Sequence, residues 1–89
     1  MTSTRTKDDQ DWLRAVGAAV RARRLELGLS QEELGYRARL DRSYLSGVER
    51  GVRNATATSL RRIAAALETQ VGRLAMAAEG LVESAGSDN

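Results

Sequence analysis

Several residue types are absent from this 89-residue chain, and each absence excludes a kind of chemistry. There is no cysteine, so no disulfide can brace the fold and no thiol can serve as a nucleophile or metal ligand. There is no histidine, which removes the commonest metal ligand and the commonest general base near neutral pH. Because the carboxylates are not clustered either, we expect no enzyme, no cofactor and no small-molecule ligand.

Proline and phenylalanine are also absent, whereas alanine and leucine are abundant, and this composition favours an all-α fold. The length suits one small domain. No apolar run approaches the roughly 18 residues of a membrane span. The first residues are polar and acidic, unlike a signal peptide, so we expect a cytoplasmic protein.

The charge is unevenly distributed along the chain. The net charge is only +2, but residues 14–73 contain twelve arginines and six acidic residues, a net charge of +6. The planar guanidinium suits phosphates and guanine edges better than the point charge of lysine does. The middle segment is therefore predicted to bind nucleic acid, the alternative being a solvated surface that uses arginine.

Helix signals divide the chain into five segments. Apolar spacing predicts a first helix over residues 11–27, which Gly28 ends. Ser30 and Glu33 form a capping-box pattern that begins a second helix over residues 31–38.

The later helices are predicted from similar signals. Asp41 is a good N-cap for a third helix over residues 42–50, which Gly51 closes. Thr56 or Thr58 begins a fourth helix, and a fifth begins near Val71. The predicted organisation is a flexible tail over residues 1–10, a domain over 11–83 and a disordered tail over 84–89.

The segment from residue 30 to residue 54 has the layout of a helix-turn-helix, a unit that places its second helix in the DNA major groove. The second helix of this unit is unusually rich in serine and glycine, which are poor helix formers, so another demand outweighs helix propensity. Its predicted outward side chains are Arg42, Ser43, Tyr44, Ser46, Gly47, Glu49 and Arg50. Contact with DNA would explain why this helix contains such poor helix formers.

The spacing of SQEELG, YLSGVERG and SLRRIAAAL between residues 17 and 74 resembles the lambda-repressor and Cro class of helix-turn-helix proteins, the Xre family. Within that class, the run Asp41-Arg42-Ser43-Tyr44, the pair Ser46-Gly47 and the pair Arg53-Asn54 are most similar to the controller proteins of restriction-modification systems. The resemblance implies a five-helix homodimer that binds operator DNA and regulates transcription, with RNA polymerase as a further partner, near the bacterial nucleoid.

The resemblance also implies a role for each site residue. Arg42 would read a base, Ser43 and Ser46 would contact base edges or phosphate, and Tyr44 would contact phosphate, base or sugar. The implied backbone contacts come from Gln31, Arg53 and Asn54, and Arg50 is a further predicted DNA-binding residue.

Alternatives remain at several positions. Tyr44 could instead cover apolar surface. Glu49 is interpreted as structural, paired with Arg21 or Arg24, and Trp12 as an anchor for the first helix or a partner subunit.

A homodimer is also expected on physical grounds, because one recognition helix reads only a few base pairs. The fifth helix has apolar residues on more than one face, and a two-fold pairing through it would bury them. The predicted interface is Val71, Leu74, Ala78 and Leu81. Other functions in view are a DNA-binding antitoxin, a phage-type repressor and a protein-binding adaptor that has kept only the fold.

Overall fold

The computed structural model describes residues 6–86 and contains five α-helices in this range, with no strand among the described residues. They are α1 (Lys7–Glu26), α2 (Gln31–Ala38), α3 (Arg42–Arg50), α4 (Ala57–Ala66) and α5 (Val71–Gly86). The all-α prediction is confirmed. No helix in these residues is long and apolar enough to cross a membrane.

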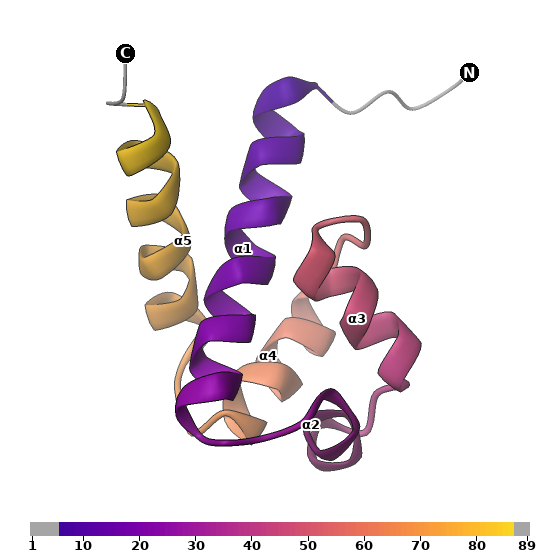
Figure 1. The fold of residues 1–89 in the computed structure, drawn as a ribbon. Helices are drawn as coiled ribbons and strands as arrows, with labels where there is room; N and C mark the ends of the chain where they lie inside the picture. Colours follow the sequence, from indigo (N-terminus) through magenta and orange to yellow (C-terminus); the bar gives the residue numbers. More distant parts are fainter. Residues whose placement is uncertain (1–5, 87–89) are drawn as a thin grey trace, which may run out of the picture.

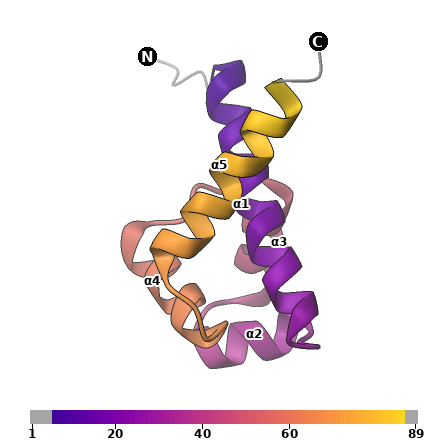
Figure 2. The same cartoon turned by 90° about the vertical axis from the view of Figure 1, so that its left-hand side faces the viewer.

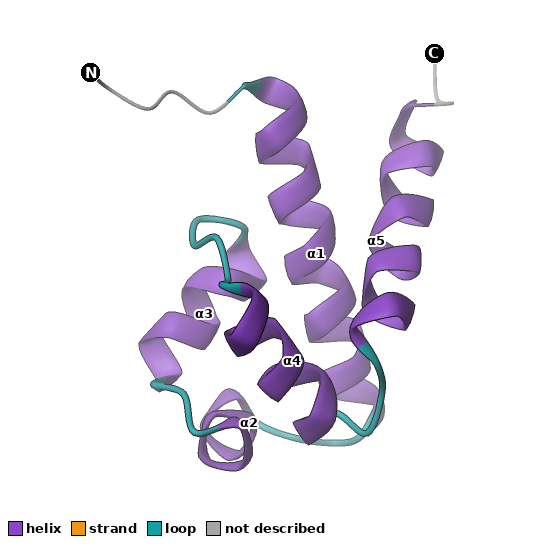
Figure 3. Cartoon of the chain, turned by 180° about the vertical axis from the view of Figure 1, so that it is seen from behind, coloured by secondary structure: helices purple, strands orange, loops and turns teal. Residues whose placement is uncertain are grey.

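The long helices α1 and α5 lie side by side, with both chain ends at the same end of the pair (Figure 1). The three shorter helices gather around the other half of α1, with α3 on the side of α1 away from α5 (Figure 1). Seen from behind, α4 lies between α3 and the α1–α5 pair (Figure 3), and the view turned by 90° shows α2 closing the lower end (Figure 2). The helix-turn-helix is therefore presented on one side of a two-helix support.

Local capping explains the bounds of α2, which agree with the sequence prediction. The Ser30 hydroxyl accepts from the Glu33 amide, and the Glu33 carboxylate accepts from the Ser30 amide, each at 3.0 Å. Both hydrogen bonds satisfy amides that a helix start leaves without partners, so the capping box is present in full.

The bounds of α3 are also as predicted. The Asp41 carboxylate accepts from the Ser43 amide at 3.0 Å and from the Ser43 hydroxyl as well. Gly51 ends the helix with a left-handed backbone, at φ 77°, which glycine adopts without steric strain. The helix that would read DNA is thus fixed at both ends by local sequence.

The first and last helices extend beyond their predicted bounds. The Thr6 hydroxyl accepts from the Asp9 amide at 3.1 Å, and this cap begins α1 at Lys7 instead of residue 11. At the other end, α5 continues to Gly86, past the predicted boundary at residue 83. The tails assigned to residues 1–10 and 84–89 were therefore too long; their remaining parts, 1–5 and 87–89, lie outside the described residues.

The core forms where the five helices meet. The largest fully buried side chains are Val20 from α1, Leu34 from α2, Leu45 and Val48 from α3, and Ile63 and Leu67 from α4 and its end. Ala78 of α5 is fully buried and Leu74 is 4 % exposed, both within this cluster.

The burial of α5 corrects the predicted dimer interface. Leu74 and Ala78 pack inside the monomer, so they are not available to a second copy. Of the four predicted residues, Leu81 is exposed and Val71 is partly buried. Apolar spacing predicted that this face would be covered, but the covering comes from the monomer's own core.

Helix α3 approaches α1 so closely that only glycine fits between them. A Cβ atom placed on Gly17 would lie 2.3 Å from the carbonyl oxygen of Val48 and 2.5 Å from that of Glu49. Such distances are far shorter than any non-bonded contact, so a side chain at residue 17 would push the two helices apart.

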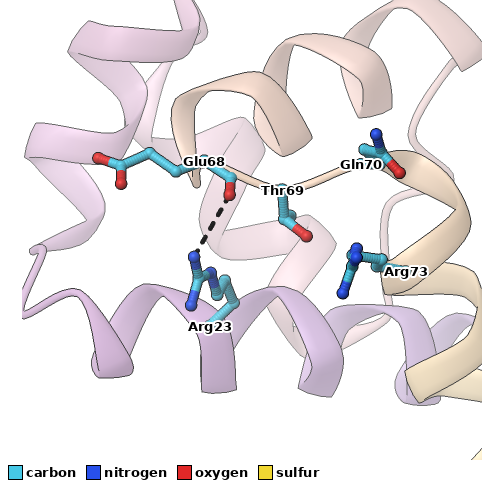
Figure 4. Close-up of a pocket in the computed structure, with 5 residues that line it drawn as sticks. All are labelled: Arg23, Glu68, Thr69, Gln70 and Arg73. Carbon is cyan, nitrogen blue, oxygen red and sulfur yellow. Dashed lines mark hydrogen bonds between the residues drawn. The ribbon is translucent and has the colours of Figure 1, made fainter.

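The turn between α4 and α5 is held from α1. Arg23 donates from Nη2 to the Glu68 carbonyl at 3.3 Å (Figure 4). It also donates from Nε to the Leu67 carbonyl at 3.0 Å. Glu68 has a left-handed backbone, at φ 57°, and these bonds fix the strained turn. Arg23 therefore braces the start of α5.

Candidate nucleic-acid interface

Helix α3 has a buried side and an exposed side. Leu45 and Val48 anchor it to the core, whereas Arg42, Ser43 and Arg50 are exposed and Ser46 is half-buried. Together with Gln31 of α2, these four polar residues surround an open hollow of about 240 Å³. Five of the predicted DNA contacts are thus brought to one surface.

A buried ion pair locks the position of α3 against α1. The Glu49 carboxylate accepts from Nε of Arg24 at 2.7 Å and from Nη2 at 2.9 Å, and the two side chains are 2 % and 9 % exposed. Arg24 also donates to the Leu29 carbonyl at 2.8 Å. The hydrogen bonds with Glu49 raise the pKa of Arg24 despite the opposing effect of burial. The pairing of Glu49 with Arg24 rather than Arg21 resolves the open alternative.

This pair also corrects the predicted outward face of α3. Glu49 was included among the outward side chains, but it is buried because its carboxylate is drawn to Arg24. Gly47, also predicted to face outward, is buried too.

Gln31 is oriented by the same carboxylate. Its Nε2 donates to Oε1 of Glu49 at 3.0 Å, so the side chain at the start of α2 is tied to α3. One N–H group of the amide is used in this way. The start of α2 still offers the free backbone amides that attract an anion. Contact between Gln31 and a phosphate stays a prediction.

The loop after α3 is ordered by a stack of side chains. The Arg53 guanidinium lies over the Tyr44 ring, with 5.8 Å between its carbon and the ring centroid. The Tyr44 hydroxyl accepts from the Thr56 amide at 3.4 Å. Tyr44 therefore packs against the loop and carries Arg53 at the edge of the exposed surface, and contact between Tyr44 and DNA stays a prediction.

Gly47 is the residue that makes room for this stack. A Cβ atom on Gly47 would lie 2.4 Å from Cγ of Arg53. The amides of Val52 and Arg53 also donate to the Gly47 carbonyl, at 2.9 and 3.1 Å. The sequence signal for this role was the glycine within a helix, which sequence reasoning attributed to close approach of DNA.

The resulting surface is cationic and rich in hydrogen-bond donors. Arg42, Arg50 and Arg53 are exposed, and so is Asn54 in the loop. Hydrogen bonds from Ser43 lower the pKa of Asp41, which keeps this capping residue a carboxylate, but its oxygens face the helix start that they cap. Exposed guanidiniums at the start of a helix and in the next loop can reach base edges and phosphates on the same duplex.

Comparison with known proteins agrees with this geometry. A family model described as helix-turn-helix matches residues 20–74, well over half of the chain, and the chain belongs to this family. A relative described as a hypothetical transcription factor from Neisseria meningitidis is 40 % identical over 60 residues. That match covers 67 % of this chain but only 57 % of the relative, so the chain spans little more than half of the relative's length.

Solved structures share the fold. The restriction-modification controller protein C.AhdI from Aeromonas hydrophila is 42 % identical, with a TM-score of 0.69 over 70 % of this chain and 94 % of that one. The controller C.Esp1396I, solved as a tetramer with its 35-base-pair operator, is 37 % identical, with a TM-score of 0.68 over 75 % and 92 %. The clp gene regulator ClgR from Corynebacterium glutamicum is 30 % identical, with a TM-score of 0.79 over 86 % and 84 %.

Proposed function

We propose that this protein is a sequence-specific, double-stranded DNA-binding transcription regulator that binds its operator as a homodimer. The observation that carries the proposal is the exposed polar face of α3, where Arg42, Ser43, Ser46 and Arg50 converge with Gln31 on a helix locked in place from behind. A rigid helix with exposed donors is what base readout requires. The protein acts without catalysis, in the cytoplasm at the nucleoid.

The regulated genes are proposed to be those of a restriction-modification system. The support is the 42 % identity to C.AhdI, which covers 94 % of that controller. A second candidate is a regulator of other operons, which the longer match to ClgR favours. RNA polymerase is proposed as a partner where the operator adjoins a promoter.

The homodimer is proposed to form through apolar residues of α5 that the monomer leaves exposed. Leu81 is 46 % exposed and Val82 37 %, and the two lie next to each other near the end of α5. In the proposed dimer interface they take the place of Leu74 and Ala78, which are buried in the core of the monomer. Sedimentation of the wild type and of Leu81→Glu tests the surface, because a dimer formed elsewhere would keep its mass in the variant.

Footprinting on the DNA upstream of the gene tests the main proposal. We expect protection of two half-sites whose centres lie one helical turn or a multiple of it apart, as two-fold symmetry requires. Binding that shows no preference for this DNA over unrelated duplex of the same length would reject the proposal. Genes for a methyltransferase and an endonuclease next to the footprint would support the restriction-modification assignment.

A further inference from the structure

The turn between α2 and α3 contains an arginine in a conformation that disfavours it. Arg39 has φ 58° and ψ 45°, in the left-handed region. A residue with a Cβ atom is strained there by roughly 1 to 2 kcal/mol, a strain that glycine would avoid. The arginine side chain is exposed and makes no hydrogen bond or ion pair with the described residues. The left-handed backbone ends α2, and the Arg39 amide caps the helix by donating to the carbonyls of Gly35 and Tyr36. Glycine would serve this turn without strain, so the fold does not explain the arginine side chain.

A second arginine reaches the same turn from α4. Arg62 Nη1 donates to the carbonyl oxygen of Arg39 at 3.5 Å, and Arg62 is exposed. Its neighbour Arg61 is also exposed but lies on the other side of α4, where it borders a hollow with Gln70 and Val71. The turn therefore has one exposed arginine of its own and a second, Arg62, whose guanidinium bonds to its backbone, whereas Arg61 lies on another side of α4.

The position of this pair relative to the exposed face of α3 suggests its ligand. Arg39 precedes Arg42 by three residues, so their Cα atoms are at most about 11 Å apart. The major groove is about 12 Å wide, so a long side chain this close to the groove reader is within reach of the bordering sugar-phosphate strand.

We propose that Arg39 and Arg62 form a phosphate clamp on the DNA backbone at the edge of each half-site, outside the base pairs that α3 reads. This inference rests on the proposed DNA-binding function and adds a contact that makes no base-specific bond. Since the clamp binds phosphate alone, it contributes affinity and salt dependence equally on all sequences.

The test measures the salt dependence of binding for the wild type and the variant Arg39→Gly/Arg62→Ala. Glycine suits the left-handed turn, so the first substitution removes a charge without straining the fold. Each lost phosphate contact should reduce the slope of log K against log salt by about 0.9, which gives about 1.8 for each half-site and about 3.6 for the homodimer on the full operator. The operator's preference over single-base variants should stay unchanged.

A trimmed operator provides a second readout, and Arg61→Ala provides the matched control. On a duplex cut back to the base pairs that α3 reads, wild type and double variant should bind with equal affinity, because the phosphates of the clamp are gone. Arg61→Ala should keep the full slope on the long duplex. Thermal unfolding of each variant checks that the fold is intact.

Three results would overturn the clamp. An unchanged slope in the double variant would show that neither arginine contacts a phosphate, and an equal loss in Arg61→Ala would show that these arginines act only as general surface charge. Unchanged DNA binding combined with lost transcriptional regulation would assign the pair to an acidic protein partner instead. If the wild-type protein showed no preference for the operator over unrelated DNA, that result would count against the proposed function itself. It can be told apart from the three results above, because those concern the variants.

Discussion

Arg24 and Arg42 are the same residue type in two opposite environments. Arg24 is 8 % exposed and gives three hydrogen bonds, two to Glu49 and one to a backbone carbonyl. Arg42 is exposed and has no ion pair among the described residues. The first arginine fixes where α3 lies, and the second is left free for a partner. The partner of Arg24, Glu49, and the exposed Arg42 both belong to α3, so one short helix combines an anchoring residue with a residue available for recognition.

Breaking the buried pair should have the largest effect. Glu49→Ala leaves the Arg24 charge buried without its partner and removes the anchor of Gln31, so we expect a loss of about 3 to 5 kcal/mol in unfolding free energy. Urea denaturation measures it. The control is Arg21→Ala, which removes an exposed arginine from α1, the helix of Arg24. Its unfolding free energy should stay within about 0.5 kcal/mol of wild type. Equal stability of the two variants would refute the anchoring role.

Removing the exposed arginine should change recognition and leave stability alone. Arg42→Ala should reduce discrimination at particular base pairs by about 1 to 3 kcal/mol, because a bidentate contact to one base edge is lost. Competition binding with operators that carry single base-pair changes measures this. A uniform loss on every sequence would reassign Arg42 to a phosphate.

A smaller effect is expected when the position of Arg53 is changed without removing its side chain. Gly47→Ala adds a methyl group where Cγ of Arg53 lies, so Arg53 must move away from the Tyr44 ring. The helix propensity of alanine offsets only part of the cost of moving Cγ and Cβ of Arg53, so we expect a modest loss of stability together with a fall in operator affinity. Thermal unfolding and DNA titration of the same sample measure both. Wild-type affinity in this variant would show that the position of Arg53 does not matter for binding.

The smallest expected effect is a pH dependence at the caps of the helix-turn-helix. Hydrogen bonds from Ser43 lower the pKa of Asp41 from its ordinary value of 3.8, and those from Ser30 lower the pKa of Glu33. A carboxyl whose pKa is lower in the folded state stabilises the fold above the unfolded value. That contribution is lost as the pH falls through the folded value.

Comparison of wild type with Asp41→Asn isolates this effect. Asparagine also caps helices but does not titrate, so the variant should lose less stability between pH 5 and pH 2 than the wild type. Chemical denaturation across this range measures the difference. Identical pH profiles would show that the Asp41 cap does not contribute to acid sensitivity.

The sequence predictions were correct where the interactions join residues close together in the sequence, and less so where they join distant residues. The bounds of α2 and α3 were correct because Ser30, Asp41 and Gly51 act on amides and carbonyls within a few residues. The cap at Thr6 is the same kind of signal, and it could have been found from the spacing of Thr6 and Asp9. Overlooking it placed the start of α1 four residues too late.

The errors concerned side chains whose neighbours are distant in the sequence. Apolar periodicity showed that Leu74 and Ala78 would be covered, but it could not tell whether the cover is the monomer's core or a second copy. In the same way, Glu49 and Gly47 were placed outward. The pairing of Glu49 with Arg24 was foreseen as one of two options, but neither this pair nor the contact of Gly47 with Arg53 leaves a periodic signal of burial.

The sequence by itself determined the helix-turn-helix, its caps and the basic character of the middle segment, since these depend on local hydrogen bonds and on composition. Only the tertiary structure decided which polar residues of α3 are available. The carboxylate of Glu49 joins Arg24 and Gln31 across 25 and 18 residues of sequence. Burial makes such a pairing obligatory, because an unpaired charge in the core would destabilise the fold. The arginines that do not take part in this pairing, such as Arg42, remain exposed and available to a partner.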